Sequence, residues 1–201
     1  MPVQHSILDN IARHISLTKK EKEDFCSLLR EETVPKKGFV LQEGQVCRNI
    51  SFVNSGALRA YHLDQQGKEA TIMFAISDWW VTDMYCFINS RPAMLYIQAI
   101  EDSHILKLSK EQLEELYINI PKFERFFRII MQGAYIREQL RVIQNLSLPA
   151  QERYDQFLSK YPQIARKVTQ KQIASYLGIT PEFLSAILGS KGRPEKNKKN
   201  R

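Results

Sequence analysis

Residues 168–188 read VTQKQIASYLGITPEFLSAIL, and this stretch predicts two short helices joined by a tight turn. Thr169 precedes a run whose apolar residues recur at helical spacing, so it is placed to cap the first helix. Gly178 supplies the left-handed conformation that ends this helix. Thr180 then caps a second helix, and Pro181 suits its first turn. The sequence therefore predicts a helix, a turn and a helix.

The outer surface of this second helix is the candidate binding surface. Its apolar spacing turns Leu184, Ile187 and Leu188 inward. Four residues near the helix start remain for the outer face: Pro181, Glu182, Ser185 and Ala186. A recognition helix presents such positions to the major groove of DNA. The alternative is a helical hairpin that has no nucleic acid partner.

The net charge supports the DNA interpretation. The chain has 201 residues and a formal charge of +7, but residues 1–148 carry 18 basic and 18 acidic side chains. Residues 149–201 carry 11 basic and 4 acidic side chains, so they hold the whole excess. The basic tail residues that are placed to neutralise phosphates are Lys191, Arg193, Lys196, Lys198, Lys199 and Arg201. A merely solvated tail is the alternative for the last six residues.

The rest of the chain predicts a β domain between helices. Short runs of β-branched and aromatic residues, separated by turn residues, predict about eight antiparallel strands over residues 33–108. Residues 6–32 read as helical, with a capping box from Thr18 to Glu21. A second capping box, from Ser109 to Gln112, begins the helices that follow the strands.

A long helix is predicted at 121–146. Its apolar residues are too many for one face, so we expect one side to cover the β domain and the other to meet a second copy of the chain. Burial of both sides within one chain is the alternative.

Several classes of protein are excluded. No run of 18 apolar residues predicts a membrane span, and the N-terminus does not resemble a signal peptide, so we expect a cytoplasmic protein. The three cysteines and four histidines have no metal-ligand spacing, and we expect reduced, mostly buried thiols and no metal. Asp78, Asp83 and His104 are conceivable acid–base groups, but no nucleophile or phosphate-binding motif accompanies them, so we do not expect an enzyme.

These segments together resemble the cyclic-AMP receptor protein/Fnr family of bacterial transcription regulators. The resemblance rests on KGFVLQEG at 37–44, ISFVNSG at 50–56, SDWW at 77–80, and the helix–turn–helix stretch. It implies an α+β fold: an N-terminal antiparallel β-roll (double-stranded β-helix or jelly roll) with flanking helices, a long central dimerisation helix and a C-terminal helix-turn-helix domain. The implied domains are 1–120, 121–147 and 148–201. The family implies a homodimer on double-stranded DNA, no membrane partner, and RNA polymerase as a candidate partner.

The resemblance, the turn and the basic tail together give ten candidate DNA-binding residues: Thr169, Gln170, Lys171, Thr180, Pro181, Glu182, Ser185, Ala186, Lys191 and Arg193. The family commonly has Arg where Ala186 stands and a basic residue where Pro181 stands. An Arg there would make a bidentate guanine contact worth about 1–3 kcal/mol. We therefore expect weaker or altered sequence specificity, with phosphate contacts supplying more of the affinity.

The ligand pocket of the family is degenerate in this sequence. The family has Gly-Glu where Val81 and Thr82 stand, and Arg-Ser or Arg-Thr where Ala93 and Met94 stand. These residues supply no charge to a cyclic phosphate, so we expect no tight cyclic-AMP binding and no cofactor. The candidate pocket residues are Val81, Thr82, Asp83, Arg91, Ala93, Met94 and Tyr135. The pocket is either filled by bulky side chains such as Trp79, Trp80, Tyr85 and Met94, or open to a more apolar ligand.

A second function remains open at this stage. The same fold would also suit a ligand-binding or protein-interaction module whose sequence-specific DNA binding has weakened or been lost. Ala186 favours this alternative, whereas the basic C-terminal segment argues against it.

Overall fold

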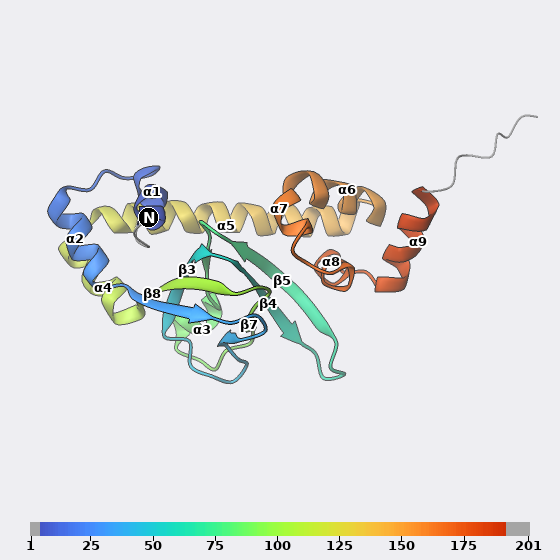
Figure 1. Ribbon diagram of the computed structural model, residues 1–201, viewed down its shortest axis with the longest axis horizontal. Helices are drawn as coiled ribbons and strands as arrows, with labels where there is room; N and C mark the ends of the chain where they lie inside the picture. The colour runs from blue at the N-terminus through green and yellow to red at the C-terminus, as the bar shows by residue number, and fades with distance from the viewer. Residues whose placement is uncertain (1–4, 192–201) are drawn as a thin grey trace, which may run out of the picture. The chain divides into compact units, whose positions relative to one another are not determined.

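The computed structural model describes residues 5–191, which divide between Arg141 and Val142 into two compact units. The first unit holds two sheets and their helices, and the second consists of helices (Figure 1). The long helix α5, Lys122–Ser147, crosses this division and begins one residue later than the predicted range 121–147. The predicted domain limits at 120 and 148 stay a prediction.

Within the described residues, eight strands form two four-stranded sheets. One has the order β1, β8, β3, β6 (Arg30–Val34, Ser103–Ser109, Asn49–Ser55, Trp80–Val81), and the other β2, β7, β4, β5 (Phe39–Leu41, Tyr96–Ala99, Ala57–Leu63, Glu69–Ile76). All paired strands are antiparallel. Because strands distant in sequence lie side by side, the sheets make the predicted β-roll. The roll begins at Arg30, slightly before the predicted residue 33.

The turn between β3 and β4 requires a glycine. Gly56 has φ +95°, a conformation that L side chains rarely adopt. A Cβ at this position would also lie 2.6 Å from Ser103 Cα and 2.7 Å from the carbonyl oxygen of Asp102. The buried Ser103 hydroxyl accepts a hydrogen bond from the Ala57 N–H at 3.1 Å. Gly56 therefore lets this turn lie directly against the start of β8.

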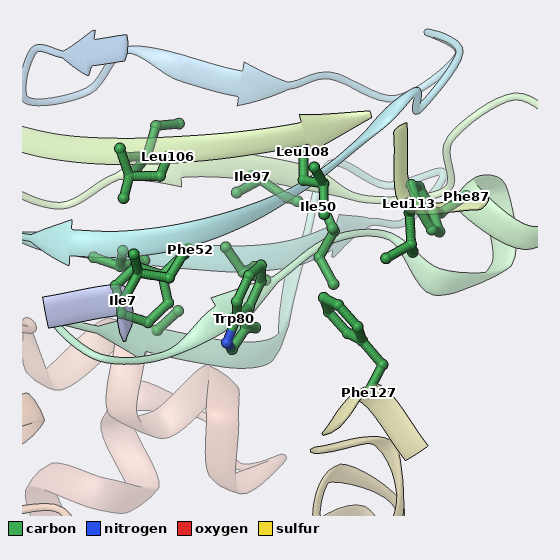
Figure 2. Close-up of a cluster of buried hydrophobic side chains, with 14 of the residues drawn as sticks. Ile7, Ile50, Phe52, Trp80, Phe87, Ile97, Leu106, Leu108, Leu113 and Phe127 are labelled. Carbon is green, nitrogen blue, oxygen red and sulfur yellow. The ribbon is translucent and has the colours of Figure 1, made fainter. Parts of the chain in front are cut away.

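The core of the roll lies between the sheets and the helices that cover them. Figure 2 shows Phe52, Trp80 and Leu106 gathered from different strands, with Phe127 of α5 closing one side. Phe52 and Leu106 are fully buried, and the rings of Trp80 and Phe127 meet edge to face at 5.2 Å. Truncating such a phenylalanine to alanine costs about 3–5 kcal/mol. The apolar residues that predicted the strands are therefore also the residues that fill the core of the roll.

The helices of this unit before α5 are α1 (His5–Ala12), α2 (Lys19–Ser27), α3 (Met84–Asn89) and α4 (Lys110–Asn119). Two of these four, α2 and α4, begin where the sequence places their caps. Both predicted capping boxes are present: Thr18 with Glu21 before α2, and Ser109 with Gln112 before α4. Each satisfies backbone N–H groups that a helix start leaves without an intrahelical partner.

Besides the apolar contacts of its buried Ile7 and Ile11, helix α1 is joined to the roll by the hydrogen bonds of Asn10. The Asn10 amide donates to the carbonyl oxygen of Asp78 at 3.0 Å and to its carboxylate at 2.9 Å. Its Oδ1 accepts from the Trp80 indole N–H at 3.1 Å. Arg13 forms an ion pair with the same Asp78 carboxylate at 2.7 Å. Asn10 is buried, so these bonds satisfy polar groups that water does not reach.

Helix α5 has two different halves. Its first turns bury Phe123, Phe126 and Phe127 in the first unit, where Phe123 stacks on Phe25 of α2 at 4.8 Å. Tyr117 of α4 also lies against Phe127, and burial raises the pKa of its phenol to about 12. Farther along, large apolar side chains of α5 are exposed in the single chain: Met131, Tyr135, Ile136, Leu140, Val142, Ile143 and Leu146.

The second unit forms its own small core. Its helices after α5 are α6 (Ala150–Lys160), α7 (Pro162–Ala165), α8 (Gln170–Leu177) and α9 (Pro181–Lys191). Their buried residues are Tyr154, Phe157, Ile164, Ile173, Ala174, Leu177 and Leu184. Helix α6 ends at Lys160, and Pro162 occupies the first turn of α7.

Candidate functional sites

The turn between α8 and α9 has the geometry that its sequence predicts. Thr169 caps α8: its hydroxyl accepts from the Gln172 N–H at 3.2 Å, and the Gln172 side chain accepts from the Thr169 N–H at 2.9 Å. Gly178 ends α8 with φ +68°. The next residue, Ile179, donates its N–H to the Ala174 carbonyl at 3.0 Å. These bonds close the C-terminal end of α8 and reverse the chain into α9.

Helix α9 presents the predicted residues to solvent. The Thr180 hydroxyl accepts from the Phe183 N–H at 3.1 Å, which fixes the first turn of the helix. Leu184 is fully buried, whereas Ile187 and Leu188 are half-buried. The four candidates Pro181, Glu182, Ser185 and Ala186 are all exposed, together with Thr180. The helical period therefore assigned this face correctly.

One exposed side chain on α9 was not among the sequence candidates. Phe183 leaves 53% of its surface exposed, although it is a large aromatic residue. It is neighbour to the buried Leu184, and at 100° per residue the two side chains leave the helix in different directions. Applied to each position in turn, that period identifies Phe183 as a further residue of the outer surface.

Basic and polar side chains surround the start of α8. Gln170 and Lys171 are exposed in its first turn after the cap residue Thr169, which is exposed as well. Arg166 and Lys167, just before the cap, are also exposed. The backbone of Lys191 lies at the end of α9, whereas Arg193 and the remainder of the basic tail lie outside the described residues. The structure thus brings most of the candidate DNA-binding residues onto one pair of helices.

The β-roll contains a small pocket of about 100 Å³ that Val81 and Thr82 help to line. Drug-sized ligand pockets typically have volumes of about 300–1,000 Å³. Thr82 donates its hydroxyl to the Asn49 carbonyl oxygen at 3.0 Å, and it lies 3.1 Å from the thiol of Cys47. Three of the residues that line the pocket, Cys47, Asn49 and Thr82, are therefore in polar contact with one another.

Asp83 lies beside this pocket with its carboxylate fully engaged. The side chain is 2% exposed. One oxygen accepts from the Cys86 N–H at 3.1 Å and so caps α3. The other accepts from the N–H groups of Met94 at 2.8 Å and Leu95 at 3.1 Å. A carboxylate therefore occupies the backbone donors of the chain segment that follows α3.

The remaining candidate pocket residues are not gathered around one cavity. Ala93 is buried like Val81, at 3% exposure. Arg91 is exposed, Met94 is 49% exposed and Tyr135 is 69% exposed. Tyr85, one of the side chains expected to fill the pocket, is exposed too. Val81 and Thr82 therefore line the small pocket, whereas Arg91, Met94 and Tyr135 are exposed, and the ligand site stays a prediction.

Two of the cysteines, Cys47 and Cys86, are joined to each other and to the chain by hydrogen bonds. The Cys47 N–H donates to the sulfur of Cys86 at 2.8 Å, and the Cys86 thiol donates to the Arg91 carbonyl at 2.7 Å. Burial raises the pKa of the Cys86 and Cys26 thiols, which keeps both in the protonated, less nucleophilic form. Across residues 5–191, no cluster of three or more His, Cys, Asp or Glu side chains has the arrangement of a metal site.

The comparisons with known proteins agree with this architecture. The family described as "Cyclic nucleotide-binding domain" matches residues 31–119. The regulatory protein HlyX of Actinobacillus pleuropneumoniae is 24% identical over 200 residues, covering 92% of this chain and 82% of HlyX. A protein of Eubacterium rectale assigned to the Crp/Fnr family of transcriptional regulators has a similar fold: 20% identity, TM-score 0.70, covering 87% of this chain and 83% of that one. The chain is therefore similar in fold to a regulator of the Crp/Fnr family, and it contains a match to the cyclic nucleotide-binding domain.

A further Crp/Fnr-like structure supports the fold over nearly the same length. The c-di-GMP-responsive global regulator CLP of Xanthomonas campestris has TM-score 0.72 and 16% identity, covering 87% of this chain and 91% of CLP. HlyX and CLP are both named as regulators. Two of the side chains first considered as acid–base groups have structural partners: Arg13 pairs with Asp78, and backbone N–H groups donate to Asp83. In the part of the chain that is described, every helix is too short or too polar to cross a bilayer.

Proposed function

We propose that this chain is a homodimeric regulator of transcription of the Crp/Fnr type that binds double-stranded DNA through α8 and α9. The observation that carries the proposal is the outer face of α9. Leu184 is anchored in the core while Pro181, Glu182, Ser185 and Ala186 are exposed next to a capped helix start. That is the arrangement by which a recognition helix reaches base edges in the major groove.

The electrostatics of the same unit supports a DNA partner. The exposed side chains of Arg166, Lys167 and Lys171 lie around the start of α8 and would neutralise phosphates. Such contacts fix the position of a protein on the duplex and carry little sequence information. The exposed face of α9, by contrast, is free of basic side chains from Pro181 to Ala186. We infer that phosphate contacts near α8 supply affinity for DNA and that base contacts from α9 select the DNA sequence.

The proposed dimer uses the exposed half of α5. Tyr135, Ile136 and Leu140 are 69%, 53% and 44% exposed in the single chain. A run of large apolar side chains along one helix is too extensive for a monomeric surface and marks an interaction site. A helix of 26 residues is about 39 Å long, which suffices for a two-fold interface.

The β-roll, which we propose as the sensor domain, does not bind cyclic AMP. A cyclic phosphate needs a positioned cation or free backbone N–H donors. Arg91 is exposed and does not line the pocket. Of the basic residues that do line it, Arg48 is exposed and Lys107 is paired with Glu32 at 2.6 Å. The donors of Cys86, Met94 and Leu95 already serve Asp83. The negative charge of Asp83 would also repel a phosphate. Isothermal titration calorimetry of the purified protein should show no binding of cyclic AMP, and micromolar affinity would contradict this part of the proposal.

The test of DNA binding is selection of duplexes from a random pool at physiological salt. A sequence-specific regulator should enrich a palindromic site. The double variant Glu182→Ala, Ser185→Ala should enrich a different site or none. The control is Gln156→Ala, which replaces an exposed residue of α6 and should enrich the original site. Absence of enrichment by the unmodified protein would favour the alternative, a ligand-binding or interaction module that has lost specific DNA binding.

A further inference from the structure

The exposed face of α9 has an unusual chemical composition for a base-reading surface. Its exposed residues in the first turns are Pro181, Glu182, Phe183, Ser185 and Ala186. None of them carries a positive charge, so none can donate the paired hydrogen bonds by which Arg or Lys recognises guanine. What remains is one carboxylate, one hydroxyl and a set of apolar groups.

Phe183 is the largest of these apolar groups and its position is fixed. Its backbone N–H is held by the Thr180 hydroxyl at 3.1 Å, which places Phe183 in the first turn of α9. Its neighbour Leu184 is fully buried and sets the rotation of the helix. Phe183 is therefore held at the end of the helix that a recognition helix inserts into the groove.

Phe183 and Ala186 form a continuous apolar strip. Residues three apart on a helix are neighbours on its surface, so Ala186 follows Phe183 along the axis. Glu182 lies on the other side of Ala186 at a spacing of four residues. The apolar strip thus runs beside a single hydrogen-bond acceptor.

The chemistry of this strip matches one feature of the major groove. Thymine is the base that presents an apolar group there, its 5-methyl, and side chains such as Phe and Ala recognise it by contact. Glu accepts a hydrogen bond from the cytosine amino group. We propose that Phe183, with Ala186, reads thymine methyl groups, so that the preferred half-site contains thymines next to a cytosine. This inference rests on the proposed DNA-binding function and names the bases that it selects.

The test removes a single methyl group from the DNA. Once a site has been selected from the random pool, each thymine is replaced in turn by deoxyuridine, which differs only by the missing methyl. Binding is measured by fluorescence anisotropy at fixed salt. For the unmodified protein, one or two positions should lose about fourfold in affinity, the equivalent of the ~0.8 kcal/mol for one buried methylene-sized group.

Two variants make the result specific to Phe183. The Phe183→Ala protein should bind the thymine and deoxyuridine duplexes equally, whereas Phe183→Leu should retain most of the difference. Equal thermal unfolding midpoints of the variants and the unmodified protein would show that the fold is intact. An unchanged methyl effect in Phe183→Ala, or the absence of any methyl effect in the unmodified protein, would overturn this inference while leaving DNA binding intact. Failure of the unmodified protein to enrich any site would instead refute the proposed function, and this inference with it.

Discussion

The Met94 N–H donates a hydrogen bond to the carboxylate of Asp83 at 2.8 Å, across eleven residues of the chain. With the bonds from Cys86 and Leu95, it makes Asp83 the common acceptor for a helix start and the segment that follows it. An internal carboxylate thus holds together a part of the roll that would otherwise present free N–H groups.

Replacing Asp83 with alanine should destabilise the first unit by about 3 kcal/mol, because three N–H donors would lose a charged acceptor away from water. Urea unfolding followed by tryptophan fluorescence measures this loss. Asp64→Ala is the matched control. Asp64 also accepts two backbone N–H bonds, from Gln66 and Lys68, but it lies on an exposed turn where water replaces them. Equal losses in the two variants would argue against the importance of Asp83.

Substituting Leu140 with glutamate should convert the proposed dimer into a monomer, since a buried carboxylate without a partner is costly. Sedimentation equilibrium reports the change in mass. The control is Gln156→Glu, which adds the same charge to an exposed polar position of α6. If Leu140→Glu sedimented as a dimer, the interface would have to lie elsewhere.

The turn at Gly178 gives a test of backbone conformation free of steric effects. A Cβ there would meet nothing within 4 Å, so the cost of a side chain comes from φ +68° alone. Gly178→Ala should lower the stability of the second unit by about 1 kcal/mol, and Gly178→Asn by less, because asparagine tolerates this conformation better. Thermal unfolding followed by circular dichroism would rank the variants. An alanine variant as stable as the unmodified protein would contradict the left-handed turn.

Stability should fall at high pH because of Tyr117. Burial raises the pKa of its phenol to about 12, above the unfolded value of about 10. The folded state therefore holds this proton more tightly, and its contribution is complete below pH 10 and is lost as the pH rises towards 12. The urea midpoint of Tyr117→Phe should decline less between pH 9.5 and 11.5 than that of the unmodified protein. Parallel declines would exclude Tyr117 as a source of the effect.

Local sequence signals predicted most of the fold. The capping residues Thr18, Ser109 and Thr169 and the turn residue Gly178 act on their own helix ends, so short stretches of sequence suffice to identify them. The strands of the β-roll were predicted from short runs of β-branched and aromatic residues separated by turn residues. Burial of one face sets the register of such strands.

Features that depend on contacts between distant segments were harder to predict from the sequence. The three donors to Asp83 become neighbours only when the segment after α3 folds back, so its sequence position indicated a pocket wall and not a buried acceptor. Tyr135 was expected at the pocket because of the family resemblance. In the single chain its side chain is 69% exposed. The position of Phe183, by contrast, follows from the helical period, which turns its side chain away from the buried Leu184.

The hydrogen bonds of Asn10 have a practical consequence for anyone who shortens this protein. Helix α1 precedes the β-roll in the chain and lies outside the matched domain at 31–119, so it is an obvious segment to trim. Trimming it would remove the acceptor for the Trp80 indole and the Arg13 partner of Asp78. An isolated sensor fragment should therefore start before α1, since one that starts at the first strand would expose a tryptophan from its own core.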